Sequence, residues 1–273
     1  KKTSDVSAFQ ERYAGPYRQI WGASIPKPDL LRADLVKTQR IAGVRTECFV
    51  IGRKEKGEAV RAVLFTPAAD NVAADAVILV DPEWFTQHGS ATCEPTTTMK
   101  TLVRARFPVL VVEPFRSDPK AERKYGKFPE TFLPTDTAYR VQDILTAGAF
   151  LQSRFPQKMR LHLMGTGNAG MLCLFASALD DRFVSTTADL NEFDIENDEK
   201  WVEEYYVPCI RSLGDVLTAC ALIAPRHLRL VRPSTSFPLE KVKAIFPGRS
   251  IRVFQEMPRG DLLVSLIKAS AHG

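Results

Sequence analysis

Hydrophobic residues follow two different patterns along this chain. Between residues 33 and 66, three strand-like runs are separated by Gly43 and by a polar turn at 54–57. These runs, Ala33–Thr38, Val44–Arg53 and Ala59–Thr66, predict an antiparallel meander. From residue 76 onward the pattern changes, because Ala76–Val80 is apolar throughout. A continuous apolar run of this length predicts a strand of a sheet that is buried on both faces.

The rest of the chain alternates between short apolar runs and segments with helical spacing of apolar residues. Helices are expected at Thr96–Arg106, Asp136–Ser153, Ala169–Leu179, Lys200–Tyr206, Asp215–Ile223, Leu239–Ile245 and Asp261–Ala269. Strands are expected at Val109–Val112, Leu161–Met164, Phe183–Ala188, His227–Val231 and Ser250–Gln255. Antiparallel strands that lead into repeated strand–helix units predict an α/β fold with one mixed, mostly parallel sheet and helices on both faces.

The N-terminal region has a different texture. Residues Ser7–Trp21 are amphipathic, Pro16 complicates a single helix there, and Pro26 and Pro28 interrupt the pattern. We therefore separate an N-terminal helical extension, residues 1–32, from a single α/β domain over 33–273. Because the chain begins without Met and without an apolar signal core, we expect a processed product or one domain of a longer polypeptide.

Charge and composition exclude several classes of function. The net charge is +5, with an acidic stretch between 189 and 204 and basic residues spread through the pattern after Ala224. Basic residues that follow alternating strands and helices predict a solvated surface and no nucleic-acid partner. No apolar run approaches the roughly 20 residues that a membrane-spanning helix needs, so we expect no membrane partner.

Cysteines and histidines give no sign of a metal or cofactor site. The five cysteines are odd in number, and no C-x-x-C motif occurs among them. The four histidines are not at helical spacing from one another. Because zinc sites and disulfide frameworks use clustered or paired ligands, we predict neither a metal nor a cofactor, and we expect Cys173 and Cys220 to be small buried hydrophobes.

The segment Arg160–Gly170 is the richest in candidate chemistry. An apolar strand passes through Gly165, Gly167 and Gly170 into an apolar helix. The string reads G-x-G-x-x-G, the dinucleotide fingerprint, and Asp189 follows about 20 residues later, where an acid would bind ribose hydroxyls. The same register overlays the nucleophile elbow G-x-S-x-G, with glycine in the serine position. Five or so strands precede the segment, which favours the elbow, and a dinucleotide-binding protein stays as an alternative.

Three segments carry a resemblance to a known family. They are the helix containing Arg140–Ala147, the elbow with its helix, and the run Ala219–Arg226 before the next strand. Their order resembles acetyl xylan esterase-like and dienelactone hydrolase-like members of the α/β-hydrolase superfamily, over roughly residues 33–269. The resemblance implies an α/β-hydrolase fold and an esterase-like domain of the carbohydrate acetyl esterase class. It also implies a secreted or periplasmic location.

The catalytic triad of that family has no counterpart at the matching positions. Gly167 stands where the serine should be, in an elbow made of Gly165, Gly167, Asn168 and Gly170. The residues after the strand His227–Val231, Arg232–Ser236, supply no carboxylate, and the loop Met257–Gly260 has no histidine, while His272 lies beyond the last helix. The resemblance therefore implies a non-catalytic domain that binds a carbohydrate ester or small ester. Alternatively, it stabilises a companion hydrolase domain or another copy of itself.

A second set of residues keeps an active hydrolase open as an alternative. His88 and Cys93 follow the apolar strand 76–80, and Asp189 ends the strand after the elbow. Strand ends of this kind meet at the carboxyl edge of a parallel sheet, and a cysteine beside a histidine can act as a nucleophile. Asp81 and Trp84, on the same loop as His88, are expected at the mouth of the pocket.

Overall fold

The structure of the protein is a computed structural model, and it describes residues 3–67, 72–89, 92–116, 133–155, 157–246, 248 and 250–270. A single twisted sheet organises these residues, with the strand order β1-β2-β3-β5-β4-β6-β7-β8-β9. The strands are β1 Leu31–Ile41, β2 Val44–Arg53, β3 Val60–Thr66, β4 Asp75–Val80, β5 Val109–Glu113, β6 Arg160–Gly165, β7 Phe183–Asp189, β8 His227–Val231 and β9 Ile251–Phe254.

The sheet combines an antiparallel part and a parallel part, as the sequence predicts. Strands β1, β2 and β3 form an antiparallel meander, and β3 pairs antiparallel with β5. From β5 to β9 all neighbours are parallel. The carboxyl ends of β4 to β9 therefore lie along one edge of the sheet, which we call the carboxyl edge. The opposite edge, where these strands begin, is the amino edge.

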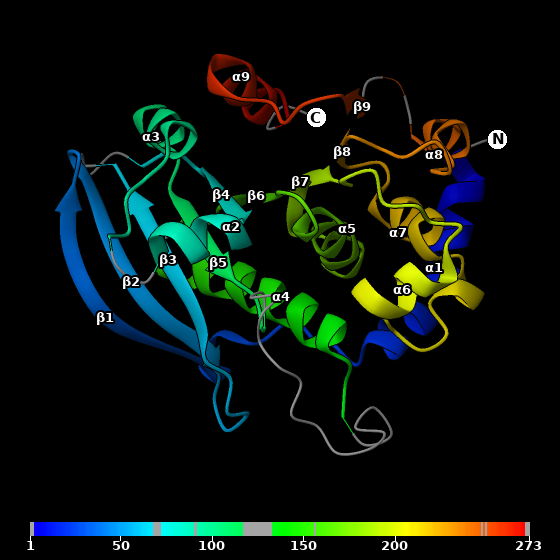
Figure 1. Cartoon of the computed structure of the whole chain (residues 1–273), viewed down its shortest axis with the longest axis horizontal. Helices are drawn as coiled ribbons and strands as arrows, with labels where there is room; N and C mark the ends of the chain where they lie inside the picture. Colours follow the sequence, from blue (N-terminus) through cyan, green and yellow to red (C-terminus); the bar gives the residue numbers. More distant parts are fainter. Residues whose placement is uncertain are drawn as a thin grey trace.

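Helices cover both faces of the sheet (Figure 1). Helices α3 (Thr97–Arg104) and α9 (Gly260–Ser270) bury Met99, Leu102, Leu263 and Ile267 in one apolar cluster. On the other face, the larger cluster takes its side chains from α1 (Thr3–Trp21), α4 (Asp136–Arg154), α5 (Ala169–Leu179), α6 (Asp198–Glu204), α7 (Asp215–Ile223) and α8 (Leu239–Ile245). Because each face has its own core, the strands of the parallel part are apolar on both sides.

The N-terminal helix differs from the expectation at one point. Helix α1 runs from Thr3 to Trp21 without interruption, although Pro16 lies inside it. Its last turns are firmly packed, because Tyr17 and Trp21 are 0% and 1% exposed and Trp21 lies 5.0 Å from the ring of Phe175 in α5. Burial of two aromatic rings is worth several kcal/mol, enough to offset the roughly 3 kcal/mol that proline costs inside a helix.

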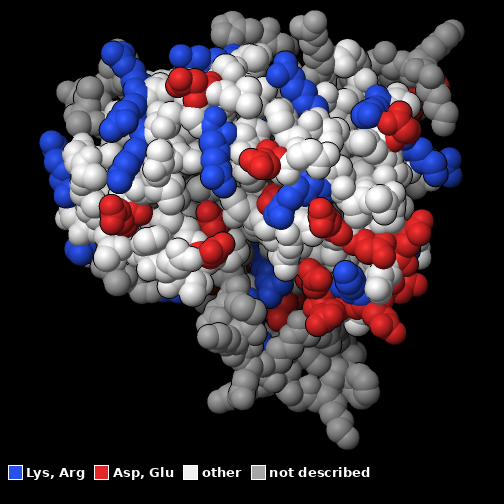
Figure 2. Space-filling view, turned by 45° about the horizontal axis from the view of Figure 1, so that its top comes forward, with Lys and Arg blue, Asp and Glu red and all other residues white. Residues whose placement is uncertain are grey.

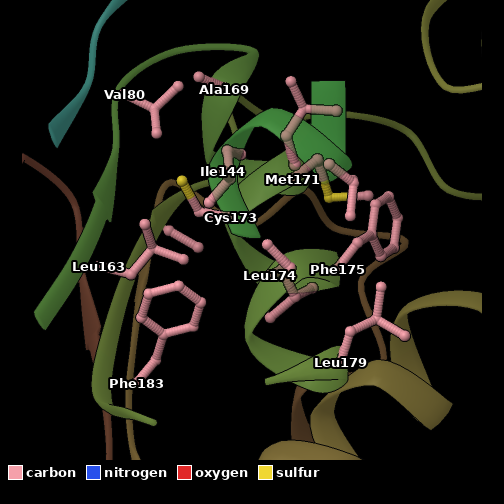
Figure 3. Close-up of a cluster of buried hydrophobic side chains, with 14 of the residues drawn as sticks. Val80, Ile144, Leu163, Ala169, Met171, Cys173, Leu174, Phe175, Leu179 and Phe183 are labelled. Atoms are coloured by element: carbon pink, nitrogen blue, oxygen red, sulfur yellow. The ribbon is translucent and has the colours of Figure 1, made fainter. Parts of the chain in front are cut away.

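Helix α5 occupies the centre of the larger core. Figure 3 shows Cys173 directed toward Leu163 of β6, with Val80 of β4 and Phe183 of β7 nearby. Cys173 is fully buried, and burial raises the pKa of its thiol well above the usual value. Cys220 of α7 is also fully buried. Both cysteines therefore serve as small apolar side chains, which confirms the expectation from sequence.

The surface shows no continuous basic patch on the face drawn in Figure 2, where Lys and Arg side chains are interspersed with neutral and acidic ones. Acidic side chains gather at the lower right of that view, on the side where α6 lies in Figure 1. Among the described residues, none of the helices combines the length and the apolar character that a membrane crossing requires.

Candidate functional site

The glycine segment forms a tight turn between β6 and α5. Gly167 has a φ of +52°, which L-amino acids rarely adopt. Ala169 N donates to Thr166 O (3.1 Å) and Gly170 N donates to Gly167 O (3.0 Å), so the chain reverses within these few residues. A Cβ atom at position 167 would meet no atom within 4 Å. The turn is thus tight, half-buried and open to a side chain at position 167, and the elbow expected from the sequence falls on it.

Gly165 and Gly170, on either side of the turn, are glycines for a different reason. A Cβ at Gly165 would lie 2.6 Å from Ala169 O and 2.7 Å from Cys173 Sγ. A Cβ at Gly170 would overlap the backbone N, C and O atoms of Asp189. These positions are glycine because α5 packs directly on β6 and β7, so the G-x-G-x-x-G spacing has a steric explanation within the fold.

Asp189 lies at the end of β7 and is fixed by three groups. Its Oδ2 accepts from Gly167 N (3.0 Å) and from Arg232 Nη2 (2.7 Å). Its Oδ1 accepts from Arg232 Nε (3.1 Å) and from Asn191 N (3.1 Å). The Asp189 side chain is 5% exposed. A buried carboxylate with this many donors is held in place beside the elbow as an ion pair.

Arg232 is a partner of Asp189 that the sequence pattern does not predict. It directly follows β8, among residues 232–236, which supply no carboxylate. The register brings Asp189 opposite Val231, so the next residue on β8 reaches Asp189. Predicting the pair of Asp189 and Arg232 requires the strand order, because neighbouring parallel strands place their carboxyl ends side by side.

The helix start is held by two further contacts. Asn168 Oδ1 accepts from Asn191 Nδ2 (2.8 Å), and Asn168 O accepts from the hydroxyl of Tyr205 (2.8 Å). Tyr205 itself is 2% exposed and packs edge-on against Phe193. The backbone around Gly167 is therefore anchored on both sides by groups that come from β7 and α6.

Asp81 and Trp84, expected at the pocket mouth, have separate environments. Asp81 Oδ1 accepts from Trp84 N (3.0 Å) at the start of α2 (Pro82–Trp84). Burial raises the pKa of Asp81, although hydrogen bonds from Trp84 N and from the Thr166 side chain act to lower it. Because Thr166 directly precedes Gly167, the Asp81 carboxyl lies beside the elbow. Trp84 is 3% exposed, and its Nε1 donates to Glu94 O (3.0 Å). Its ring is part of the core on the α3 side.

The structure places His88, Cys93 and Asp189 in different surroundings. His88 is half-buried in a π-helical turn, Phe85–Gly89, with its ring 6.2 Å from that of Trp84. Cys93 is buried, and its Sγ lies 3.3 Å from Cys48 Sγ of β2. Cys93 and His88 are connected through the backbone, Cys93 N to His88 O (2.8 Å). None of the side-chain hydrogen bonds found among the described residues joins two of the three.

A cavity of about 450 Å³ lies on the same edge, at the end of β5. Phe115 and Tyr139 contribute aromatic rings 5.3 Å apart, and Arg61, Glu113 and Asp143 contribute ionisable groups. Asp143 is 5% exposed, and its Oδ2 accepts from Phe115 N (2.7 Å). Burial raises the pKa of Asp143 to about 7. β4 alone separates β5, which leads into the cavity, from β6, which leads into the elbow, so these two strands are about 10 Å apart.

A serine–histidine–aspartate chain does occur, at the opposite edge. His162 of β6 has Nε2 at 3.0 Å from Asp75 Oδ1 and Nδ1 at 2.8 Å from Ser185 Oγ. His162 and Ser185 are each 1% exposed. The chain lies where β4, β6 and β7 begin, inside the core and without access for a substrate. His162 is a packed histidine with a hydrogen-bond partner at each ring nitrogen.

No protein-family model and no curated protein matches the sequence. Solved structures do match the fold. A glucuronoyl esterase from Solibacter usitatus has a TM-score of 0.66 at 14% identity, over 94% of this chain and 91% of that chain. Acetyl xylan esterase 1 from a Thermoanaerobacterium species has a TM-score of 0.58 at 13% identity, over 97% and 93% of the two chains. A promiscuous esterase from a marine bacterial metagenome has a TM-score of 0.64 at 13% identity, over 95% and 90%.

The sheet order, the helices on both faces and these neighbours establish an α/β-hydrolase fold of the kind found in esterases. The fold predicted from the sequence is thereby confirmed. Among the described residues, no group of three or more His, Cys, Asp or Glu side chains is arranged to hold a metal ion. His272 lies outside the described residues.

Proposed function

We propose that this protein is a non-catalytic esterase-like domain that binds a carbohydrate ester or a related small ester at the carboxyl edge of its sheet. One observation carries the proposal: Gly167 occupies the apex of the elbow, and Asp189 beside it is bound by Gly167 N and Arg232. A serine esterase needs a hydroxyl at that apex and a histidine to take its proton. Here an ion pair fills the neighbourhood of the elbow instead.

The ligand class rests on the fold neighbours and on the cavity. Structures of similar fold are named as glucuronoyl and acetyl xylan esterases. The cavity at the end of β5 offers aromatic rings from Phe115 and Tyr139 beside polar groups, a combination suited to a sugar ring with several hydroxyls. The strands that lead into the cavity and into the elbow, β5 and β6, are about 10 Å apart, and we propose that one acetylated disaccharide reaches both sites.

Calorimetry with acetylated xylo-oligosaccharides tests the binding role. We expect saturable heat for the wild-type protein and at least tenfold weaker binding for Tyr139→Ala, because this change removes a ring from the cavity wall. Tyr206→Ala is the matched control, since Tyr206 is 41% exposed, follows α6 and does not line the cavity. Absence of binding by the folded wild-type protein would contradict the proposal.

Hydrolysis of a short-chain aryl acetate tests the absence of catalysis. We expect the wild-type rate to equal that of buffer. A rate well above buffer that disappears in Gly167→Ala would overturn the proposal, and loss of the rate in His88→Ala, Cys93→Ala or Asp189→Ala would identify the alternative site. A role as partner of a second hydrolase domain or of another copy is tested by light scattering of the intact protein during size-exclusion chromatography.

A further inference from the structure

Cys93 lies beside a second cysteine that the sequence pattern does not predict. Cys48 lies in the middle of β2, opposite Val63 of β3, and Cys93 follows the π-helical turn 45 residues later in the chain. Their Sγ atoms are 3.3 Å apart, and both side chains belong to the apolar cluster on the α3 side of the sheet. Cys93 also has a φ of +49°, so the backbone there already has an unusual conformation that directs its side chain.

We propose that Cys48 and Cys93 are an oxidisable pair, which a low-molecular-weight disulfide such as oxidised glutathione converts into an intramolecular disulfide. The geometry asks for little movement, because a disulfide requires the sulfurs to come from 3.3 Å to bonding distance. Of the five cysteines, Cys173 and Cys220 are fully buried in helices, and Cys209 is exposed. Cys48 is half-buried, so an oxidant can reach one member of the pair.

The reaction proceeds by two exchange steps. The Cys48 thiolate attacks oxidised glutathione, forms a mixed disulfide and releases one glutathione thiolate. The Cys93 thiol then loses its proton and attacks the Cys48 sulfur, which forms the protein disulfide and releases the second glutathione. The two protein sulfurs are oxidised, and one molecule of oxidised glutathione is reduced to two of glutathione.

The environment of the pair sets the rate of this reaction. Burial raises the pKa of Cys48 to about 12, and the Cys93 thiol beside it acts in the same direction. Because the thiolate is the attacking species, exchange is slow near neutral pH and accelerates as the pH rises.

The disulfide would tie two distant parts of the chain together. Cys93 N donates to His88 O (2.8 Å), and the adjoining residue Glu94 accepts from Trp84 Nε1 (3.0 Å). Cross-linking Cys93 to β2 therefore fixes the segment that carries Trp84 and His88 against the meander. The described part of this segment follows β4 at the carboxyl edge. The disulfide itself is independent of the proposed ligand.

The test uses the full chain with Cys209→Ser, which removes the exposed thiol and leaves four of the five cysteines. After incubation with excess oxidised glutathione at about pH 9, we expect thiol titration in denaturant to fall from four to two. Peptide mapping should then show a peptide pair joined through Cys48 and Cys93. Dithiothreitol should reverse both changes, and the urea midpoint of the oxidised form should be higher by roughly 1 M.

Cys48→Ser and Cys93→Ser in the same background are matched controls, each of which should abolish the cross-link and the rise in the urea midpoint. Circular dichroism verifies that they fold. The proposal is overturned if the folded protein keeps four thiols under these conditions. It is equally overturned if Cys48 stops at the glutathione adduct or if the cross-link involves Cys173 or Cys220.

Discussion

The two edges of the parallel sheet hold two different sets of polar groups. At the carboxyl edge, the tight turn after β6 has a positive φ at Gly167, a residue without a side chain. At the amino edge, Ser185, His162 and Asp75 form the hydrogen-bonded chain of a catalytic triad, buried beyond reach of a substrate. The comparison teaches that neither residue types nor backbone geometry alone make a catalytic site. A catalytic site also needs a nucleophile at a position that a substrate can reach.

Two buried aspartates, Asp75 at the amino edge and Asp143 near the carboxyl edge, have opposite pKa shifts. At the amino edge, burial acts to raise the pKa of Asp75, but hydrogen bonds from Arg160 (2.7 Å) and His162 outweigh it and lower the pKa well below the usual value. At the carboxyl edge, burial dominates for Asp143 and raises its pKa to about 7, because a single backbone N–H from Phe115 donates to it. A carboxyl beside cations is charged, and a carboxyl in a poorly compensated cavity keeps its proton.

The largest expected effect comes from the packing of the elbow helix. Gly170→Ala should destabilise the protein by about 4 kcal/mol or more, because the new Cβ overlaps backbone atoms of Asp189 and α5 has to move off β7. Gly167→Ala is the matched control and should destabilise the protein by about 1 kcal/mol. The new Cβ meets no atom, so this loss comes from the positive φ alone. Urea unfolding followed by circular dichroism measures both. Equal losses would mean that Gly170 is not a packing requirement.

The next effect is a pH-dependent change at Asp143. Because its pKa is raised on folding, the folded state binds more protons than the unfolded state between about pH 4 and pH 7, and stability falls as the pH rises through that window. Asp143→Asn should therefore stabilise the protein at pH 8 by on the order of 3 kcal/mol and change little at pH 4. Denaturant titrations at the two pH values measure this difference.

Asp75→Asn is the matched variant with the opposite sign. Its folded pKa is lowered, so the stability that Asp75 contributes is present above about pH 4 and is lost as the pH falls further. The variant should be destabilised at pH 7, with the loss shrinking in acid. If both variants showed the same pH dependence, the contrast between the two edges would be wrong.

The hydrogen-bonded network of Asp75, His162 and Ser185 at the amino edge should contribute to stability and not to catalysis. His162→Leu should destabilise the protein by about 2 kcal/mol, because Asp75 and Ser185 each lose a buried hydrogen-bond partner. Arg229 also donates to Ser185 Oγ (3.1 Å), so Ser185→Ala should behave similarly and more weakly. The hydrolysis of aryl acetate should stay at the buffer rate in both variants. If the wild-type protein had a measurable rate and either variant lost it, the network of Asp75, His162 and Ser185 would be catalytic.

The smallest expected effect is that of restoring the missing hydroxyl. Gly167→Ser should leave the hydrolysis rate at that of buffer, because none of the hydrogen bonds found among the described residues joins a histidine to Gly167 or Asp189, and Asp189 is already bound to Arg232. Gly167→Ala serves as the control for the backbone. A rate in Gly167→Ser that exceeds both would place a general base at this edge and would contradict a degenerate site.

The hydrophobic pattern alone determined most of the fold. Continuous apolar runs such as Ala76–Val80 can only be stable with cover on both faces, and the turn glycines set the order of strands and helices. The interruption expected at Pro16 did not occur, because burial of Tyr17 and Trp21 in the core outweighs the local cost of proline. Local pattern does not report a packing partner that lies far away in the chain.

The identity of the side chains at the elbow was also fixed by sequence, since Gly167 can carry no nucleophile in any conformation. The tertiary structure alone decided which charged and thiol groups meet. Asp189 contacts Arg232, 43 positions away, because the register of β7 and β8 places these residues side by side. Cys93 contacts Cys48, 45 positions away, because the segment after β4 packs against β2. Such distances depend on the order of strands in the sheet, which only the balance of packing over the whole chain determines.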